Sequence, residues 1–291
     1  MALSCSLAWS NSPQAAPITF NTALPVARGV FMAREQLVVH RSGEDPSEAQ
    51  RERTEVAAIS VLGYGITNRW ALFGELAYRD IDLDRTTDGQ RISRSTSGFG
   101  DLSLLARHTA YRHDRLGQTL RVAPFAGIKA PTGEHDDRDS HGRLPASVQA
   151  GTGSWDYFGG IVMTYQTLRY QMDGQIAYRE NTVADDFEAG DVWRLDGSLQ
   201  YRLHPLELAG GVPAFIYGVL EANLVHEGRN RIDGRRDPDS GGTRFFLTPG
   251  LQYVGRRWLL EGALQVPVAQ NLNGGALETD YLLRAGVRFN F

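Results

Sequence analysis

The chain has 291 residues and a formal net charge of −4, which is length enough for one large domain or two ordinary ones. This charge balance argues against nucleic-acid binding, which usually requires a basic face or stripe. Hydrophobic residues make up 42% of the chain, and no apolar run approaches the roughly 18 to 20 residues that a transmembrane helix needs. Membrane-spanning strands are not excluded, because such strands alternate apolar and polar residues and therefore have a low average hydropathy.

We expect residues 1–16 to be the remnant of a signal peptide or a disordered N-terminus, and residues 17–291 to form a single barrel domain. A signal peptide carries a basic region before its apolar stretch, yet no Lys or Arg precedes Arg28. Cys5 is the only cysteine, so no intramolecular disulfide can form. A lipidated cysteine and a signal-sequence remnant are the two interpretations, and the second is favoured because residues 2–4 lack a good lipobox pattern.

Alternation with a period of two runs along most of the remaining chain. Successive side chains of a strand point to opposite faces, so a strand between two media reads apolar, polar, apolar, polar. Residues 193–202 are an example: Trp193, Leu195, Gly197, Leu199 and Tyr201 take one face, and Arg194, Asp196, Ser198, Gln200 and Arg202 take the other. The pattern predicts strands at residues 27–40, 52–65, 70–82, 98–111, 118–131, 154–166, 168–180, 189–203, 213–226, 242–254, 257–268 and 277–291.

The connections between these strands alternate in length. The predicted long connections are residues 41–51, 83–97, 132–153, 181–188, 227–241 and 269–276. The others are short, apart from residues 204–212. Outer-membrane barrels have short periplasmic turns and longer outer loops, and an even number of strands places both termini in the periplasm. Pro124 and Pro267 fall inside predicted strands, where each should cause a bulge or a broken hydrogen bond.

Aromatic residues bracket several apolar faces in pairs that are eight residues apart: Trp70 with Tyr78, Trp193 with Tyr201, and Tyr170 with Tyr178. At about 3.3 Å per residue and about 40° of tilt, each pair spans about 20 Å, close to the apolar band of about 25 Å between the aromatic girdles of an outer-membrane barrel. The pattern predicts an all-β fold, a transmembrane antiparallel up-and-down β-barrel of about 12 strands in the bacterial outer membrane. A soluble barrel or sandwich is the alternative, and it requires the apolar faces to point inward.

The C-terminal strand is a further indication. Its apolar face runs from Tyr281 to the last residue, Phe291. A terminal strand that ends in Phe resembles the signal that the bacterial barrel-assembly machinery recognises. We therefore expect that machinery and outer-membrane lipid as partners.

Several glycine-containing motifs occur in order along the chain: residues 98–102 (GFGDL), 127–133 (GIKAPTG), 151–156 (GTGSWD) and 248–253 (TPGLQY). In this order and spacing they resemble the outer-membrane family named after the meta-pathway of phenol degradation, over roughly residues 60 to 291. The resemblance implies a transporter-like barrel, related in shape to channels for hydrophobic and aromatic compounds. We expect Gly100, Gly127, Gly151 and Gly153 to serve assembly at strand ends, where positive φ or close backbone approach is needed.

The polar strand faces supply the candidate lumen residues. Both signs of charge are mixed there, with a cationic surplus. One interpretation is a polar pore whose charges tune selectivity, and the other is a network of paired charges that fills and stiffens the barrel. The predicted lumen or pore-lining residues are Glu75, Arg79, Asp101, Arg107, Arg121, Lys129, Arg169, Asp173, Arg179, Arg194, Asp196, Arg202, Glu221, Glu261, Arg284 and Arg288.

Metal and catalytic sites find weaker support. His135, Asp137 and His141 are weak candidates for metal ligands, but an exposed polar outer loop is the default interpretation, and no metal or cofactor is expected. His108 is the clearest membrane-facing histidine, as some outer-membrane lipases use a Ser/His pair on the outer wall. No nucleophile elbow accompanies it, and no Rossmann or Walker pattern occurs, so no catalytic residue is predicted.

The sequence thus predicts an outer-membrane, transporter-like channel for passive uptake or efflux of small solutes, with hydrophobic or aromatic solutes as candidates, and not an enzyme. The alternatives are an outer-membrane hydrolase and a closed structural or adhesion barrel whose outer loops bind a partner.

Overall fold

The computed structural model describes residues 14–207 and 214–291. The regular secondary structure of this part of the chain is β-strand apart from one 3-10 helix, η1 (Ala146–Val148), and it contains no helix long and apolar enough to cross a membrane. The strands that form the barrel wall are β1 (Phe31–Ser42), β2 (Glu52–Gly65), β3 (Trp70–Thr87), β4 (Gln90–Phe99), β5 (Leu102–His108), β6 (Tyr111–Arg115), β7 (Gln118–Ala130), β10 (Asp156–Thr167), β11 (Tyr170–Glu180), β13 (Val192–His204), β14 (Phe215–Glu227), β17 (Gly242–Val254), β18 (Trp258–Leu272) and β19 (Tyr281–Asn290). Short strands in the loops are β8 (Arg138–Asp139), β9 (Gly142–Arg143), β12 (Phe187–Glu188), β15 (Arg231–Ile232) and β16 (Arg235–Arg236).

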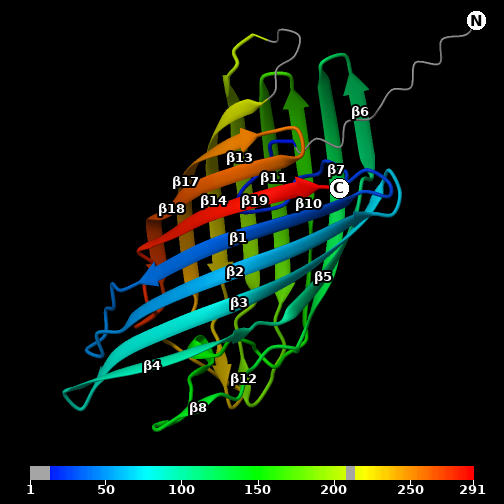
Figure 1. Ribbon diagram of the computed structural model, residues 1–291. Helices are drawn as coiled ribbons and strands as arrows, with labels where there is room; N and C mark the ends of the chain where they lie inside the picture. Colours follow the sequence, from blue (N-terminus) through cyan, green and yellow to red (C-terminus); the bar gives the residue numbers. More distant parts are fainter. Residues whose placement is uncertain (1–13, 208–213) are drawn as a thin grey trace, which may run out of the picture.

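Within the described residues the wall is a closed antiparallel barrel of 12 strands, as the sequence predicted. Each strand pairs with its neighbours in chain order, and β1 pairs with β19 to close the ring. One strand of the wall is interrupted and consists of the three pieces β4, β5 and β6. β4 pairs with β3, β5 pairs with both β3 and β7, and β6 pairs with β7. The C-terminus lies at the end of the barrel opposite β8 and β12, which belong to the long loops (Figure 1).

The prediction of a loop at residues 83–97 is wrong. β3 continues to Thr87 and forms a hairpin with β4 through a turn at Asp88 and Gly89, whose φ angles are 51° and 76°. Beyond Tyr78 the outward face of β3 carries acidic side chains, which resembles a loop in sequence but suits a strand that stands in water above the membrane. The inward residues Ile81 and Leu83 are buried against Leu144 and Val148 from a distant loop, and this packing stabilises the hairpin.

Pro124 and Pro267 lie beside interruptions of the ladder, as expected for a residue without a backbone N–H. The register of β17 and β18 shifts beside Pro267, between Phe245 and Phe246. Pro124 in β7 lies opposite the break between β5 and β6, where Thr109 donates instead to the carbonyl oxygen of Arg69 at 2.8 Å.

The outer surface is an apolar band between aromatic girdles. At the end with the short turns, ring pairs include Phe31–Tyr64 and Tyr253–Trp258, with centroids 4.6 and 5.0 Å apart. At the other end, Tyr178 and Trp193 lie 4.6 Å apart. Outward leucines between the girdles are widely exposed: Leu195 is 56% exposed and Leu251 is 58% exposed. An apolar belt of this extent requires lipid around it, so the apolar faces point outward and the soluble alternative is wrong. The barrel spans the bacterial outer membrane.

Candidate functional site

The centre of the barrel is occupied by the N-terminal segment, residues 14–25. Ala15, Ala16, Ile18 and Ala23 are at most 4% exposed, although they belong to no strand. Residues 1–13, which include Cys5 and most of the predicted signal-peptide remnant, lie outside the described residues. The remainder of that predicted remnant, residues 14–16, lies within the lumen. The lumen is therefore built from the barrel wall and this segment together.

Wall side chains bind the main chain of the segment. Glu221 on β14 accepts hydrogen bonds from the backbone N–H groups of Ile18 (2.6 Å) and Thr19 (3.1 Å). Gln252 on β17 donates to the carbonyl oxygen of Ala16 at 2.7 Å and accepts from its N–H at 3.3 Å, as a neighbouring strand would. Because these contacts satisfy buried backbone groups, losing either side chain leaves unpaired polar atoms.

The opposite wall holds the second half of the segment. Arg107 on β5 donates to the carbonyl oxygens of Thr22 and Leu24, the latter at 2.7 Å. The hydroxyl of Thr164 on β10 accepts from the N–H of Ala23 at 2.8 Å. Contacts to both walls fix the segment across the lumen, rather than along one strand.

A third group of contacts comes from the seam between the first and last strands. Arg34 and Gln36 on β1 donate to the carbonyl oxygen of Ile18 at 2.7 and 3.3 Å. Both also donate to Glu261 on β18, with the Arg34 Nη2 to Glu261 Oε1 distance at 2.5 Å. Arg288 donates to the carbonyl oxygen of Gln14. The segment thus ties together strands that are far apart in the sequence.

Apolar contacts complete the fit. Ile18 packs with Val219 and Ala263. A Cβ at Gly250, the glycine of the motif at residues 248–253, would lie 2.9 Å from Ile18 Cδ1. This motif glycine therefore leaves room for the N-terminal segment, a role the sequence alone did not indicate.

The other motifs meet at the outer rim. Lys129 pairs with Asp101 at 3.1 Å and with Asp156 at 2.5 Å. Asp101 accepts from the N–H groups of Gly133 and Thr152, both at 2.9 Å. These residues come from the motifs at 98–102, 127–133 and 151–156. These contacts join three segments next to the loops. They are made largely by Asp101 and Lys129, two of the predicted lumen residues, whereas the expected assembly role concerned the motif glycines.

The predicted lumen charges divide by what they contact. Arg79 lies 3.7 Å from Glu55, and Arg194 lies 3.1 Å from Asp196. Five of the predicted residues contact the N-terminal segment or a side chain that binds it: Arg107, Asp173, Glu221, Glu261 and Arg288. Further inward contacts are Arg284 with Gln265 and Gln36, Arg202 with the ring of Phe215, and Arg121 with Asp114 near the turn of the β6–β7 hairpin.

The prediction that Arg169 lines the lumen is wrong. This residue lies in the turn between β10 and β11, and its guanidinium carbon is 5.3 Å from the ring centre of Tyr201, an outward-facing residue. The alternation would place Arg169 in the lumen only if the strand began before Tyr170, but residues 168 and 169 form the turn between β10 and β11.

Between the N-terminal segment and the outer loops, the lumen is accessible to solvent. Glu75 on β3 and Arg179 on β11 point inward but remain exposed, whereas Glu221 is fully buried. The guanidinium carbon of Arg179 lies 5.8 Å from the ring centre of Phe158. Phe158 in turn packs against an apolar cluster formed by Ala23 of the N-terminal segment and by Ala123, Phe125 and Val162 of the wall. Charged and aromatic groups therefore share this vestibule.

Sequence reasoning missed the neutral members of the lumen. Thr164, Gln171, Gln200, Asn223, Thr248 and Gln252 are at most 1% exposed. They occupy the same inward positions as the predicted charges, so the alternation could have identified them if amides and hydroxyls had been counted with the charged residues.

The histidines considered for metal binding or catalysis do not assemble into a site. His135 lies 3.7 Å from Asp185, and Asp137 accepts from the hydroxyl of Thr96 at 2.6 Å. His141 lies beside Asp139. The described residues hold no group of three or more His, Cys, Asp or Glu side chains placed to bind a metal ion. His108 stacks on Trp70 with ring centres 4.5 Å apart and makes no hydrogen bond to a serine within the described ranges.

The fold resembles outer-membrane barrels of known structure. An outer membrane channel from Pseudomonas putida F1 superposes with a TM-score of 0.71 at 16% identity, covering 96% of this chain and 100% of that one. The transport unit of the autotransporter AIDA-I from Escherichia coli gives a TM-score of 0.52 at 10% identity, covering 97% and 95%. At these identities the likeness concerns the fold alone. Comparison with curated proteins gives no match.

A sequence profile settles the family that the motifs indicated. The profile described as the MetA-pathway of phenol degradation matches residues 54–267, most of the barrel wall and three of the long loops. The chain belongs to the outer-membrane family of the MetA-pathway of phenol degradation.

Proposed function

We propose that this barrel is a passive channel for small solutes whose conductance is limited by the N-terminal segment. The observation that carries the proposal is the difference between the two halves of the lumen. Glu75 and Arg179 face a solvated vestibule, while Glu221 and the segment it binds are buried. Solvent reaches the vestibule, and the segment narrows the path beyond it.

The vestibule wall favours solutes with both an aromatic ring and an anionic group. Phe158 offers an aromatic face, and Arg179 beside it offers a guanidinium group that binds carboxylates. The charged neighbours of Arg179 are the carboxylates of Asp156 and Glu75 and the guanidinium groups of Arg194 and Arg79, so arginines outnumber carboxylates there. We therefore propose aromatic acids as the first solutes to test, with simple phenols as the comparison, because a phenol has the ring but is neutral near pH 7.

Single-channel conductance in a planar bilayer tests this proposal. Discrete current steps that aromatic acids block would support it. In Glu221→Gln the charge that holds Ile18 and Thr19 is removed, so we expect larger or more frequent openings. The matched control is Glu227→Gln on the same strand, because Glu227 pairs with Arg244 and does not contact the segment.

A closed structural barrel is the second candidate, favoured by the number of side chains that bind the segment. It predicts stable insertion without conductance in the wild-type protein and in Glu221→Gln alike. That result would overturn the channel proposal.

Assembly is a separate proposal. Phe289, the last outward residue of β19, is 44% exposed, and Phe291, which follows the strand, is 66% exposed. We propose that this terminal strand is the contact for the barrel-assembly machinery.

A further inference from the structure

Two outer loops interlock at the mouth of the barrel. β12, in the loop between β11 and β13, pairs with β15, which forms a hairpin with β16 in the loop between β14 and β17. The N–H of Gly190 donates to the side-chain oxygen of Asn230 at 3.0 Å, and Arg231 pairs with Glu188 at 2.8 Å. Contacts between the loops hold this small sheet in one arrangement, which lowers the entropic cost of binding a ligand there.

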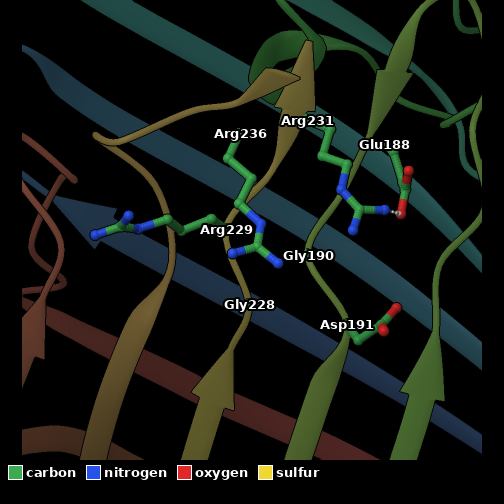
Figure 2. A pocket seen from close by; sticks show the side chains of 7 residues that line it. All are labelled: Glu188, Gly190, Asp191, Gly228, Arg229, Arg231 and Arg236. Atoms are coloured by element: carbon green, nitrogen blue, oxygen red, sulfur yellow. Dashed lines mark hydrogen bonds and ion pairs between the residues drawn. The ribbon is translucent and has the colours of Figure 1, made fainter. Parts of the chain in front are cut away.

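A cavity of about 240 Å³ lies between these loops, lined by Glu188, Gly190, Asp191, Gly228, Arg229, Arg231 and Arg236. Figure 2 shows the guanidinium group of Arg236 turned toward Gly190 and Gly228, while Arg229 extends to the other side of its loop. A Cβ at Gly190 would clash with the carbonyl group of Gly228, so the two glycines allow the loops to approach closely. The main chain of Gly190 and Gly228 therefore forms the base of the cavity, and arginine side chains lie around it.

The acidic residues of the cavity are already engaged. Asp191 points away from the arginines in Figure 2 and accepts from the hydroxyl of Tyr178 at 2.8 Å and from the N–H of Asn181 at 3.0 Å. Glu188 is paired with Arg231. Arg229 and Arg236 have no carboxylate partner in the part of the chain that the structure describes. The cavity therefore carries a surplus of guanidinium groups.

We propose that this cavity binds a phosphate group. A guanidinium group presents paired N–H donors that match the oxygens of phosphate, and a phosphate monoester carries about −1.5 to −2 charges at neutral pH. Arg231 and Arg236 reach the cavity against one facing carboxylate, Glu188, and Arg229 adds positive potential from the other side of its loop. This charge balance suits a doubly charged group with several oxygens better than a single carboxylate. The cavity is smaller than the roughly 300 Å³ at which pockets for whole drug-sized ligands begin, so it takes the anionic group rather than an entire large solute.

Arg236 is the principal donor in this site. It faces the two glycines at the base of the cavity without an acidic partner among the described residues, whereas Arg231 is shared with Glu188. Arg229 adds to the positive potential at the mouth. The phosphate group could belong to a dissolved solute or to the lipopolysaccharide that surrounds the barrel, and both sources present the same chemistry to Arg236.

Titration calorimetry with inorganic phosphate tests the site, using the full chain folded in an uncharged detergent. We expect saturable binding that weakens roughly tenfold or more in Arg236→Gln, the loss expected for a charge-assisted hydrogen bond. The matched control is Arg138→Gln, which removes the same charge from an exposed two-residue strand, β8, in another outer loop. It should change the affinity by less than about twofold, because no specific contact is lost.

A second titration separates the sources of phosphate. Lipopolysaccharide and its phosphatase-treated form are added to the same variants. Inorganic phosphate binding that depends on Arg236 identifies a site for dissolved phosphates. Binding only of intact lipopolysaccharide, weakened in Arg236→Gln and not in Arg138→Gln, identifies a lipid site. Absence of both, or equal loss in the two variants, overturns the proposal. The conductance experiment is independent of this outcome.

Discussion

At the scale of single residues, glycines decide how closely the barrel wall can pack. Gly127 on β7 lies beneath the ring of Phe158 on the neighbouring strand β10, and Gly160 on β10 lies beneath Phe125. Aromatic rings cover the glycines on adjacent strands, which fills the space that a missing side chain leaves. The family motif at residues 127–133 therefore begins with a packing requirement.

Gly127→Ala should destabilise the barrel. The added Cβ would lie within 2.6 Å of Phe158 Cε2 and 2.5 Å of the Leu104 carbonyl oxygen, and relieving such overpacking costs about 1–3 kcal/mol. Denaturant unfolding in detergent micelles measures the change. Gly197→Ala is the control, because a Cβ there meets nothing within 4 Å. Equal stability of the two variants would contradict the packing argument.

At the scale of elements, the hairpin of β3 and β4 depends on a loop from elsewhere in the chain. Arg94 on β4 donates to Asp139 through two hydrogen bonds of 2.7 Å and also to the carbonyl oxygen of Gly142 at 3.0 Å. These groups lie beyond the aromatic girdle, outside the membrane-spanning part of the barrel, and Arg94 is buried between the hairpin and the loop. Hydrogen bonds from Arg94 lower the pKa of Asp139 more than its limited burial raises it, and the N–H of His141 lowers it further.

This lowered pKa predicts how docking of the loop depends on pH. A carboxyl whose pKa is depressed in the folded state stabilises that state above its unfolded pKa of about 3.9 and ceases to do so as pH falls through the folded value. Amide protection factors in residues 137–149, measured by hydrogen–deuterium exchange, should stay level from about pH 7 to 5 and fall below about pH 4.

Two variants control this experiment. In Arg94→Gln, protection should already be low at neutral pH and should vary less as the solution is acidified. Arg91→Gln should behave like the wild-type protein, because Arg91 forms exposed ion pairs with Glu52 and Asp84. The same acid profile in Arg94→Gln and in the wild-type protein would contradict the assignment to Asp139.

At the scale of the whole molecule, the girdles place the barrel in the membrane. Trp70 and Trp258 lie at the end with the short turns, and Trp193 lies at the opposite end. Aromatic girdles sit at the two membrane–water interfaces. In single-tryptophan variants that keep one of these three residues, the fluorescence should be quenched more strongly by lipids brominated near the headgroup than by lipids brominated near the chain end. Stronger quenching by chain-end bromine would contradict the predicted depth.

The barrel as a whole is stabilised from inside by contacts between its wall and the N-terminal segment. Its interior is polar, and Glu221, Gln252 and Arg107 bind a segment of the same chain rather than one another. Buried polar groups must be hydrogen-bonded, and an extended segment offers N–H and carbonyl groups in both directions. The lumen network and the N-terminal segment therefore depend on each other.

Local order in this protein could be predicted from the sequence by itself. The strands, their inward and outward faces, the girdles and the family all follow from alternation and short motifs, because a strand between lipid and a polar lumen must alternate whatever surrounds it. The N-terminal signal peptide stays a prediction. Only the tertiary structure decided that residues 14–25 cross the lumen, that residues 83–97 extend a hairpin, and that Arg169 turns away. Each of these depends on partners far along the chain, such as Glu221 for Ile18, and contacts of that kind have no period that a sequence can display.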